Sequence, residues 1–126
     1  MPTDESIAKG AARFEELMGW HVDPAALQDD FARLTMGNLF GDVWSRPGLA
    51  LRDRSMITVA TLIALGREPE LKLHLQGALR VGITRQEIQE MILHLAHYAG
   101  WPVAVGAGRV AQQVFNEADQ RGGDAG

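Results

Sequence analysis

Residues 39–67 read LFGDVWSRPGLALRDRSMITVATLIALGR, and they carry the strongest indication of how the chain folds. It joins an arginine-rich loop to an almost entirely apolar segment, Met56 to Leu65. A helix that is apolar on nearly every side is typically buried all round. A chain of 126 residues builds only one modest core, so we expect part of this helix surface to be covered by another subunit.

Helical periodicity dominates the rest of the chain, and no stretch alternates like a β-strand. Thr84 and Glu87 have the spacing of a capping box, which marks the start of a helix. The expected helices run from Thr3 to Met18, from Asp23-Pro24 to about Phe40, from Arg52 to Leu65, from Pro69 to Gly82, from Thr84 to Ala99 and from Pro102 to about Ala118. We therefore predict an all-α, single-domain six-helix bundle over residues 1–121 and a disordered tail at residues 122–126.

Composition and charge exclude several classes of function. The net charge of −4 argues against a nucleic-acid partner, because phosphate binding normally needs a basic face. The absence of cysteine removes disulfides, thiolate nucleophiles and cysteine metal ligands. The start of the chain, MPTDESIAKGAARF, has no signal-peptide pattern, and the longest apolar run is too short to span a bilayer. These features predict a soluble cytoplasmic protein without a membrane partner.

The arginine-rich loop is a candidate anion site. It contains Arg46, Arg52 and Arg54 close to Trp44, and the planar guanidinium group suits carboxylates because it donates two parallel hydrogen bonds. We favour Arg46 and Arg52 as substrate-facing, since Arg46 lies in a Pro-Gly loop beside Trp44. The alternative is a set of surface cations paired with nearby carboxylates, namely Asp42, Asp53 and Glu70.

His74 is the main candidate for acid–base chemistry. It lies at the edge of an apolar helical face and beside Gly77 and Ala78, whose small size leaves room for a ligand. The alternative is a structural histidine at the edge of the core whose ring bonds to a backbone carbonyl.

A polar stripe on the expected fifth helix contains Glu87, Glu90, His94 and His97, at positions i, i+3, i+7 and i+10. Glu90, His94 and His97 have a spacing that metal ligands can have. The same spacing arises on any polar helix face, so we expect a solvated or interface-lining face and no metal. Of the two histidines we favour His97, next to Tyr98, as the one that points to a pocket.

Several motifs together resemble those of a known family. They are Trp44-Ser45-Arg46-Pro47-Gly48-Leu49, Glu70-Leu71, His74, Gly77-Ala78-Leu79, Gly82, Glu87-Ile88, Tyr98, Gly100 and Pro102. Over roughly Phe31 to Phe115 the chain resembles the carboxymuconolactone decarboxylase family. The resemblance implies a helical fold of the alkylhydroperoxidase-D-like type that assembles as a ring, a homotrimer or a homohexamer.

The resemblance also bears on individual residues. His74 falls where the family carries an active-site histidine. Related alkylhydroperoxidases carry a Cys-x-x-Cys pair at the positions of Arg67 and Glu70, so peroxidase chemistry by that route is excluded here. Trp101 replaces a smaller residue at a helix junction that borders the family's active site. One possibility is that Trp101 reshapes the pocket, so that the identity of the substrate is undecided. The other is that Trp101 packs as a structural residue of the helix junction.

The function that the resemblance implies is cofactor-free decarboxylation of 4-carboxymuconolactone to 3-oxoadipate enol-lactone, in protocatechuate degradation. Loss of CO₂ leaves an electron pair that flows to the lactone carbonyl, so the substrate is its own electron sink and needs no metal or cofactor. His74 is expected to donate the proton or to bond the oxyanion, and His97 or Tyr98 is the second candidate for this role. Arg46 or Arg52 is expected to anchor the carboxylate. Trp44 and Trp101 are expected to form an apolar wall.

Two alternatives stay open. One is a decarboxylase or related lyase or isomerase of the same fold that acts on another lactone or a β-keto acid. The other is a non-catalytic oligomeric binding module, which would leave His74 and the arginine-rich loop without a task.

Overall fold

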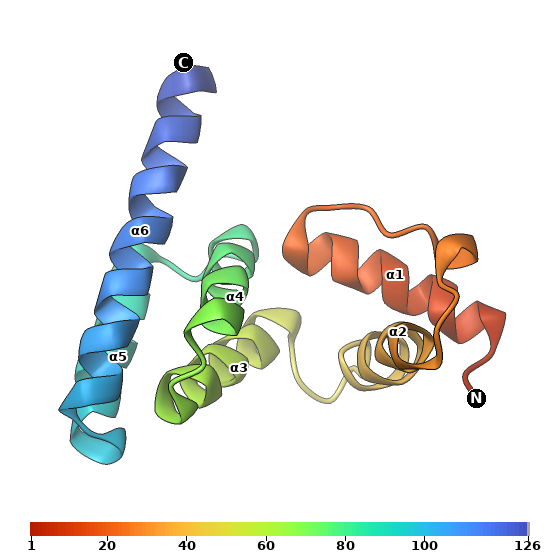
Figure 1. Ribbon diagram of the computed structural model, residues 1–126, viewed down its shortest axis with the longest axis horizontal. Helices are drawn as coiled ribbons and strands as arrows, with labels where there is room; N and C mark the ends of the chain where they lie inside the picture. Colours follow the sequence, from red (N-terminus) through yellow and green to blue (C-terminus); the bar gives the residue numbers. More distant parts are fainter. Residues whose placement is uncertain (126) are drawn as a thin grey trace. The chain divides into compact units, whose positions relative to one another are not determined.

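The computed structural model describes residues 1–125, with side chains up to residue 122, and these residues form helices, turns and loops without a β-strand. The elements are α1 (Asp4–Met18), a 3-10 helix η1 (Pro24–Ala26), α2 (Asp30–Leu34), a π-helix η2 (Thr35–Val43), α3 (Leu51–Leu65), α4 (Glu68–Arg80), α5 (Arg85–Ala99) and α6 (Trp101–Ala125) (Figure 1). The prediction of an all-α fold with six α-helices is confirmed for the part of the chain that the structure describes.

The chain divides into two compact units, residues 1–54 and the residues from 55 onward. The prediction of a single domain over residues 1–121 is not tested by this division and stays a prediction. Among the described residues, no helix is both long and apolar enough to cross a membrane.

In the first unit, α1 packs closely against the π-helix η2. The α1 helix begins at the cap Thr3, whose side chain accepts a hydrogen bond from the Ser6 backbone N–H, and ends at Gly19 in the left-handed conformation. A Cβ atom built on Gly10 would lie only 1.6 Å from the carbonyl oxygen of Met36. The two backbones therefore meet at a glycine. The buried hydrophobic residues of this unit are Ile7, Ala11, Phe14, Leu17, Met36, Phe40 and Trp44.

The predicted helix from Asp23-Pro24 to about Phe40 is wrong. Asp23 does cap a helix, but only the single 3-10 turn Pro24–Ala26, and the chain is extended again at Leu27. Asp29 caps the next helix by accepting a hydrogen bond from the Ala32 backbone N–H at 2.8 Å. Aspartate side chains compete with helix continuation by bonding nearby backbone groups, and this explains the break. From Thr35 onward the helix is of the π type.

In the second unit, α4 and α5 both pack against α6. The Thr84 capping box that starts α5 is confirmed, with reciprocal bonds between Thr84 and Glu87. Arg85, the next residue, forms an ion pair with Asp119 of α6 at 2.6 Å. The core of this unit contains Val59, Ile63, Leu71, Leu75, Ala78, Ile83, Ile88, Ala107, Val110, Ala111, Val114 and Phe115.

The helix predicted to be buried all round is buried along one face only in this chain. The fully buried residues of α3 are Ser55, Val59 and Ile63. Ile57 is 55% exposed and Leu65 is 67% exposed. A chain of this length does not supply enough partners to surround α3. Coverage of the exposed side by another subunit stays a prediction.

The predicted end of the last helix near Ala118 is also wrong, because α6 continues to Ala125. No proline or glycine interrupts the chain between residues 118 and 121, so nothing local stops the helix there. The disorder predicted for residues 122–126 stays a prediction, and Gly126 lies outside the described residues.

Candidate active site

His74 lies on the middle of α4, beside the face that packs into the core. Its neighbours Leu71, Leu75 and Ala78 are fully buried, whereas His74 is half-buried. Desolvation of the ring lowers the pKa of His74 below its ordinary value. At neutral pH the imidazole is therefore mostly uncharged, and its protonated form is a stronger acid than a free histidine. Both properties suit a group that gives a proton or a hydrogen bond to a developing anion.

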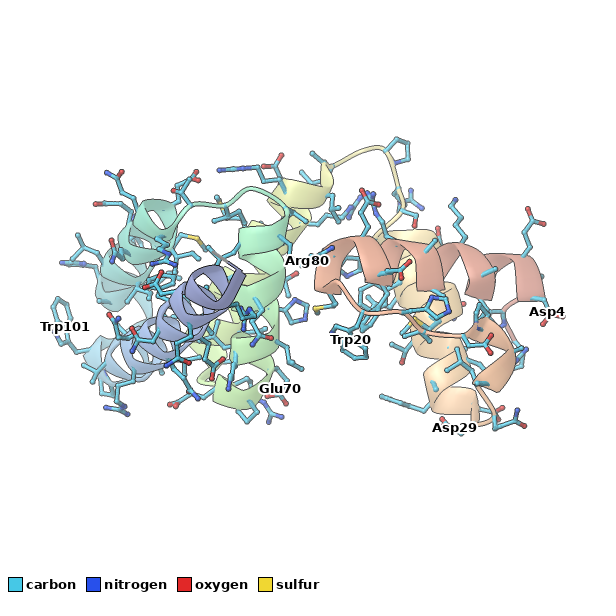
Figure 2. All side chains as sticks on the ribbon, turned by 90° about the horizontal axis from the view of Figure 1, so that it is seen from above. Asp4, Trp20, Asp29, Glu70, Arg80 and Trp101 are labelled. Carbon is cyan, nitrogen blue, oxygen red and sulfur yellow. The ribbon has the colours of Figure 1, made fainter. Side chains whose placement is uncertain are left out.

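An ion pair between Arg67 and Glu70 lies at the start of α4. The Arg67 guanidinium donates to a Glu70 carboxylate oxygen at 2.6 Å. This hydrogen bond holds the pKa of Glu70 below its usual range and raises the pKa of Arg67. Figure 2 shows Glu70 and Arg80 near opposite ends of α4. An ion pair here orders the helix start and has no redox chemistry.

In the first unit, Arg54 on the first turn of α3 has a structural contact with the arginine-rich loop. Arg54 donates to the backbone carbonyl of Arg46 at 3.3 Å and so helps to fix the loop. The Arg46 guanidinium itself lies 3.6 Å from the Asp42 carboxylate, and both side chains are largely exposed. An exposed pair of this kind is weak, so Arg46 can exchange Asp42 for another carboxylate. Arg52, on the first turn of α3, is half-buried.

Trp44 is a core residue of the first unit and is 5% exposed. Its ring stacks on Phe40 with 5.6 Å between centroids, and its carbonyl accepts a 2.9 Å hydrogen bond from Arg13. Its predicted role as a wall of the substrate pocket stays a prediction.

Three of the predicted site residues, His97, Tyr98 and Trp101, gather at the end of α5 and the start of α6. The His97 Nδ1–H donates to the Leu93 carbonyl at 2.9 Å, and the His97 ring meets Trp101 edge to face. Tyr98 is 81% exposed. Trp101 projects outward from the ribbon (Figure 2) and borders an apolar pocket of about 260 Å³ between α5 and α6. These side chains lie at the surface of their unit, and their catalytic and binding roles stay predictions.

A larger groove lies between α3 and α5. It has a volume of about 400 Å³ and is lined by Met56, Ala60, Glu90, Met91, His94 and Leu95. The polar stripe was predicted to be solvated or to line an interface, and of its two histidines His97 was favoured over His94 as the one that points to a pocket. The residue that lines this groove is His94. The sequence did contain a signal for this pocket. Glu90 and His94 are a carboxylate and an imidazole one helical turn apart, and apolar residues flank them. Within the described part of the chain, no group of three or more histidine, cysteine or acidic side chains is placed to hold a metal ion.

Comparison with known proteins agrees with the motifs. The model of the carboxymuconolactone decarboxylase family matches residues 29–113. A 4-carboxymuconolactone decarboxylase of Acinetobacter baylyi is 44% identical over 88 residues, which cover 70% of this chain and 66% of that protein. A nitrosuccinic acid decarboxylase, npaB, of Metarhizium robertsii is 40% identical over 83 residues, covering 66% of this chain and 58% of that protein.

An uncharacterised 15.0 kDa protein of Paracoccus denitrificans is 32% identical over 83 residues, which cover 64% of this chain and 62% of that protein. The chain thus matches between 58% and 66% of the length of these relatives, less than two thirds in each case. The family match covers more than half of the chain, from before the arginine-rich loop to the middle of α6. This chain belongs to the carboxymuconolactone decarboxylase family.

Proposed function

We propose that this chain is a cofactor-free carboxy-lyase that converts 4-carboxymuconolactone to 3-oxoadipate enol-lactone in protocatechuate degradation. The observation that carries the proposal is the half-buried His74 with its lowered pKa, in a chain that is 44% identical to a protein named for this reaction. A small anionic lactone is the proposed substrate.

The reaction breaks the bond between the ring carbon and its carboxylate. The released electron pair moves through the ring double bond to the lactone carbonyl and gives an enolate, while the carboxylate leaves as CO₂. A proton added to the carbon next to the carbonyl completes the product. The substrate supplies its own electron sink, so the protein needs to supply only binding, an oxyanion donor and a proton.

His74 is the proposed proton or oxyanion donor. Its imidazolium has a lowered pKa and releases a proton readily, and its neutral form still carries one N–H that can bond the enolate oxygen. Arg46 or Arg52 is proposed to anchor the carboxylate that stays on the substrate. His97 and Tyr98 are the second candidates for the proton, and Trp44 and Trp101 for the apolar wall.

The test is turnover of purified protein with carboxymuconolactone, followed by the loss of its ultraviolet absorbance. His74→Gln should lower kcat by about 10²–10⁴, the range that general acid–base catalysis supplies. Arg46→Ala should raise KM with little change in kcat, if it holds the carboxylate equally in the ground and transition states. His21→Gln is the matched control, because His21 is exposed in the first unit beside Glu15. A normal kcat for His74→Gln would remove His74 from the mechanism.

A second candidate is decarboxylation of a different acid. The relative named nitrosuccinic acid decarboxylase favours it, because a nitro group accepts an electron pair as the lactone carbonyl does. Another lactone or a β-keto acid is also a candidate, because its carbonyl group can accept the electron pair that CO₂ leaves behind. Competition assays with these acids against carboxymuconolactone would rank the candidates. Absence of turnover with every one of them would favour the non-catalytic oligomeric binding module.

The proposed assembly is a homotrimer or homohexamer in the cytoplasm. Large hydrophobic side chains of the second unit that stand exposed on a single chain support it, namely Ile57, Leu65, Leu73, Leu93 and Val105. Exposed apolar surface of this extent typically marks an interface. Light scattering at micromolar concentration should give three or six times the chain mass of 13.7 kDa, and a monomer would contradict the assembly.

A further inference from the structure

The groove between α3 and α5 has the dimensions of a small-molecule site. Its volume of about 400 Å³ lies in the range of roughly 300–1,000 Å³ that is typical of such sites. One wall is Met56 and Ala60, one turn apart on α3. The other wall contains Met91 and Leu95 of α5, also one turn apart. Methionine side chains are flexible and polarizable, and so adapt to the shape of a flat ligand.

The groove has one cluster of polar groups, formed by Glu90 and His94. These residues are four apart on α5, so their side chains are neighbours on the helix surface. The His94 ring stacks on Tyr98 with 5.0 Å between centroids and 27° between planes, which restricts its rotation. The imidazole offers the groove an N–H donor, and Glu90 gives the same part of the groove a negative charge.

The negative charge of Glu90 also determines which functional group of a ligand can bind beside it. A ligand carboxylate beside Glu90 would be repelled, whereas a carbonyl oxygen can accept the His94 N–H. The groove therefore suits an unsaturated ring that directs its carbonyl toward His94 and keeps its carboxylates elsewhere.

The other two α5 candidates are less suited to contact a ligand in this groove. The His97 Nδ1–H is engaged by the Leu93 carbonyl, and the His97 ring lies against Trp101. Tyr98 is highly exposed, and its ring supports His94.

We propose that the groove between α3 and α5 binds the unsaturated lactone ring of the substrate, and that the N–H of His94 bonds the lactone carbonyl oxygen. This inference rests on the proposed function for the identity of the ligand. It assigns to α5 a donor that stabilises the enolate oxygen as CO₂ leaves, and it places Tyr98 behind His94 as a positioning residue.

Binding can be measured without turnover. The probe is the butenolide acetate that lacks the ring carboxylate and so cannot lose CO₂, titrated into protein labelled with ¹³C at the methionine methyl groups. The methyl signals of Met56 and Met91 and the ring signals of His94 should shift in a saturable way. The signal of Met36, buried in the core of the first unit, is the internal reference and should not move.

Two variants separate the groove from the rest of the protein. Ala60→Leu fills the groove and should weaken binding of the probe at least tenfold. Ala64→Leu makes the same change one turn further along α3, at an exposed position, and should bind as the unchanged protein does. His94→Gln should lower kcat by about 10²–10³, as loss of an oxyanion donor does, and should do so more than His97→Gln. Circular dichroism of each variant checks that the helices are retained.

The outcomes distinguish this inference from the proposed function. Saturable shifts at Met56 and Met91 without turnover of carboxymuconolactone would support the groove and contradict the proposed function. Turnover with unmoved Met56 and Met91 signals, and with a normal KM for Ala60→Leu, would overturn the groove and leave the proposed function standing. A folded His94→Gln protein with unchanged kcat would overturn the role of His94.

Discussion

Replacement of Gly10 by alanine tests the closest backbone approach in the first unit. A Cβ atom at this position would lie 1.6 Å from the Met36 carbonyl oxygen and 2.8 Å from the Gly41 backbone nitrogen. Both atoms belong to the backbone of η2, so no change of rotamer can relieve the overlap. The α1 helix and η2 would have to separate by about 1.4 Å to reach 3.0 Å, below which Cβ contacts are essentially never found.

The size of the effect follows from two opposing contributions. In an open helix, glycine to alanine stabilises by up to about 1 kcal/mol. Overpacking of a close contact costs about 1–3 kcal/mol, and a rigid backbone on the far side places this contact near the upper limit. Separation of the helices also loosens the packing of Ile7, Phe14 and Leu17, which are buried in this unit. We expect a net loss of about 2 kcal/mol in the free energy of unfolding.

Urea unfolding followed by tryptophan fluorescence measures this loss. Trp20 meets Phe14 with ring centroids 4.7 Å apart and Trp44 stacks on Phe40, so both report on the first unit. A Trp101→Phe background removes the tryptophan of α6. With a urea dependence of about 1–3 kcal/mol per molar, the midpoint should fall by roughly 1 M.

Gly108→Ala is the control, because Gly108 lies within α6 and an added Cβ meets nothing within 4 Å. This variant should gain roughly 0.5–1 kcal/mol. A Gly10→Ala protein that is as stable as the unchanged protein would refute the backbone approach of α1 and η2.

Three further predictions concern the second unit and the chemistry. Thr84→Ala removes the acceptor for the Glu87 backbone N–H at 3.1 Å and should lower the free energy of unfolding by about 1 kcal/mol, measured by thermal melting; an unchanged Tm would contradict it. Burial lowers the pKa of His74, so the unfolded state takes up the proton first, and stability should fall as pH drops below about 6.5. His74→Gln should reduce this pH dependence. If the free energy of unfolding changed with pH equally in both proteins, the lowered pKa of His74 would be contradicted. Chelation with EDTA should leave decarboxylation unchanged, whereas loss of activity that zinc restores would point to a metal site.

Local signals in the sequence determined most helix boundaries. Thr3 caps α1, which ends at Met18, and Thr84 with Glu87 starts α5, as predicted. These features are predictable because a cap joins residues only three or four positions apart. The break in the helix between Asp23 and Asp29 was not predicted. Either aspartate can start a helix, and the local pattern does not show whether a helix that starts at Asp23 continues past Asp29.

The π-helix depends on contacts that a local pattern does not contain. Gly41 lies so close to α1 that an added Cβ would be 2.3 Å from the Ser6 carbonyl oxygen. That approach joins residues far apart in the sequence. A search for a period of 3.6 residues identifies a helix in this region, but it does not distinguish the α form from the π form.

From the residues alone we could infer the all-α class, the exclusion of cysteine chemistry and the family motifs around His74. The burial of His74, and therefore the direction of its pKa shift, depends on contacts between helices that the sequence does not reveal. The tertiary structure also separated His94 from His97, which lie three residues apart on one polar stripe. Met56 and Ala60 of α3 line the same groove as His94 of α5, while the His97 ring contacts Leu93 and Trp101. Burial and pocket lining arise from contacts between distant segments, and spacing along one helix does not contain that information.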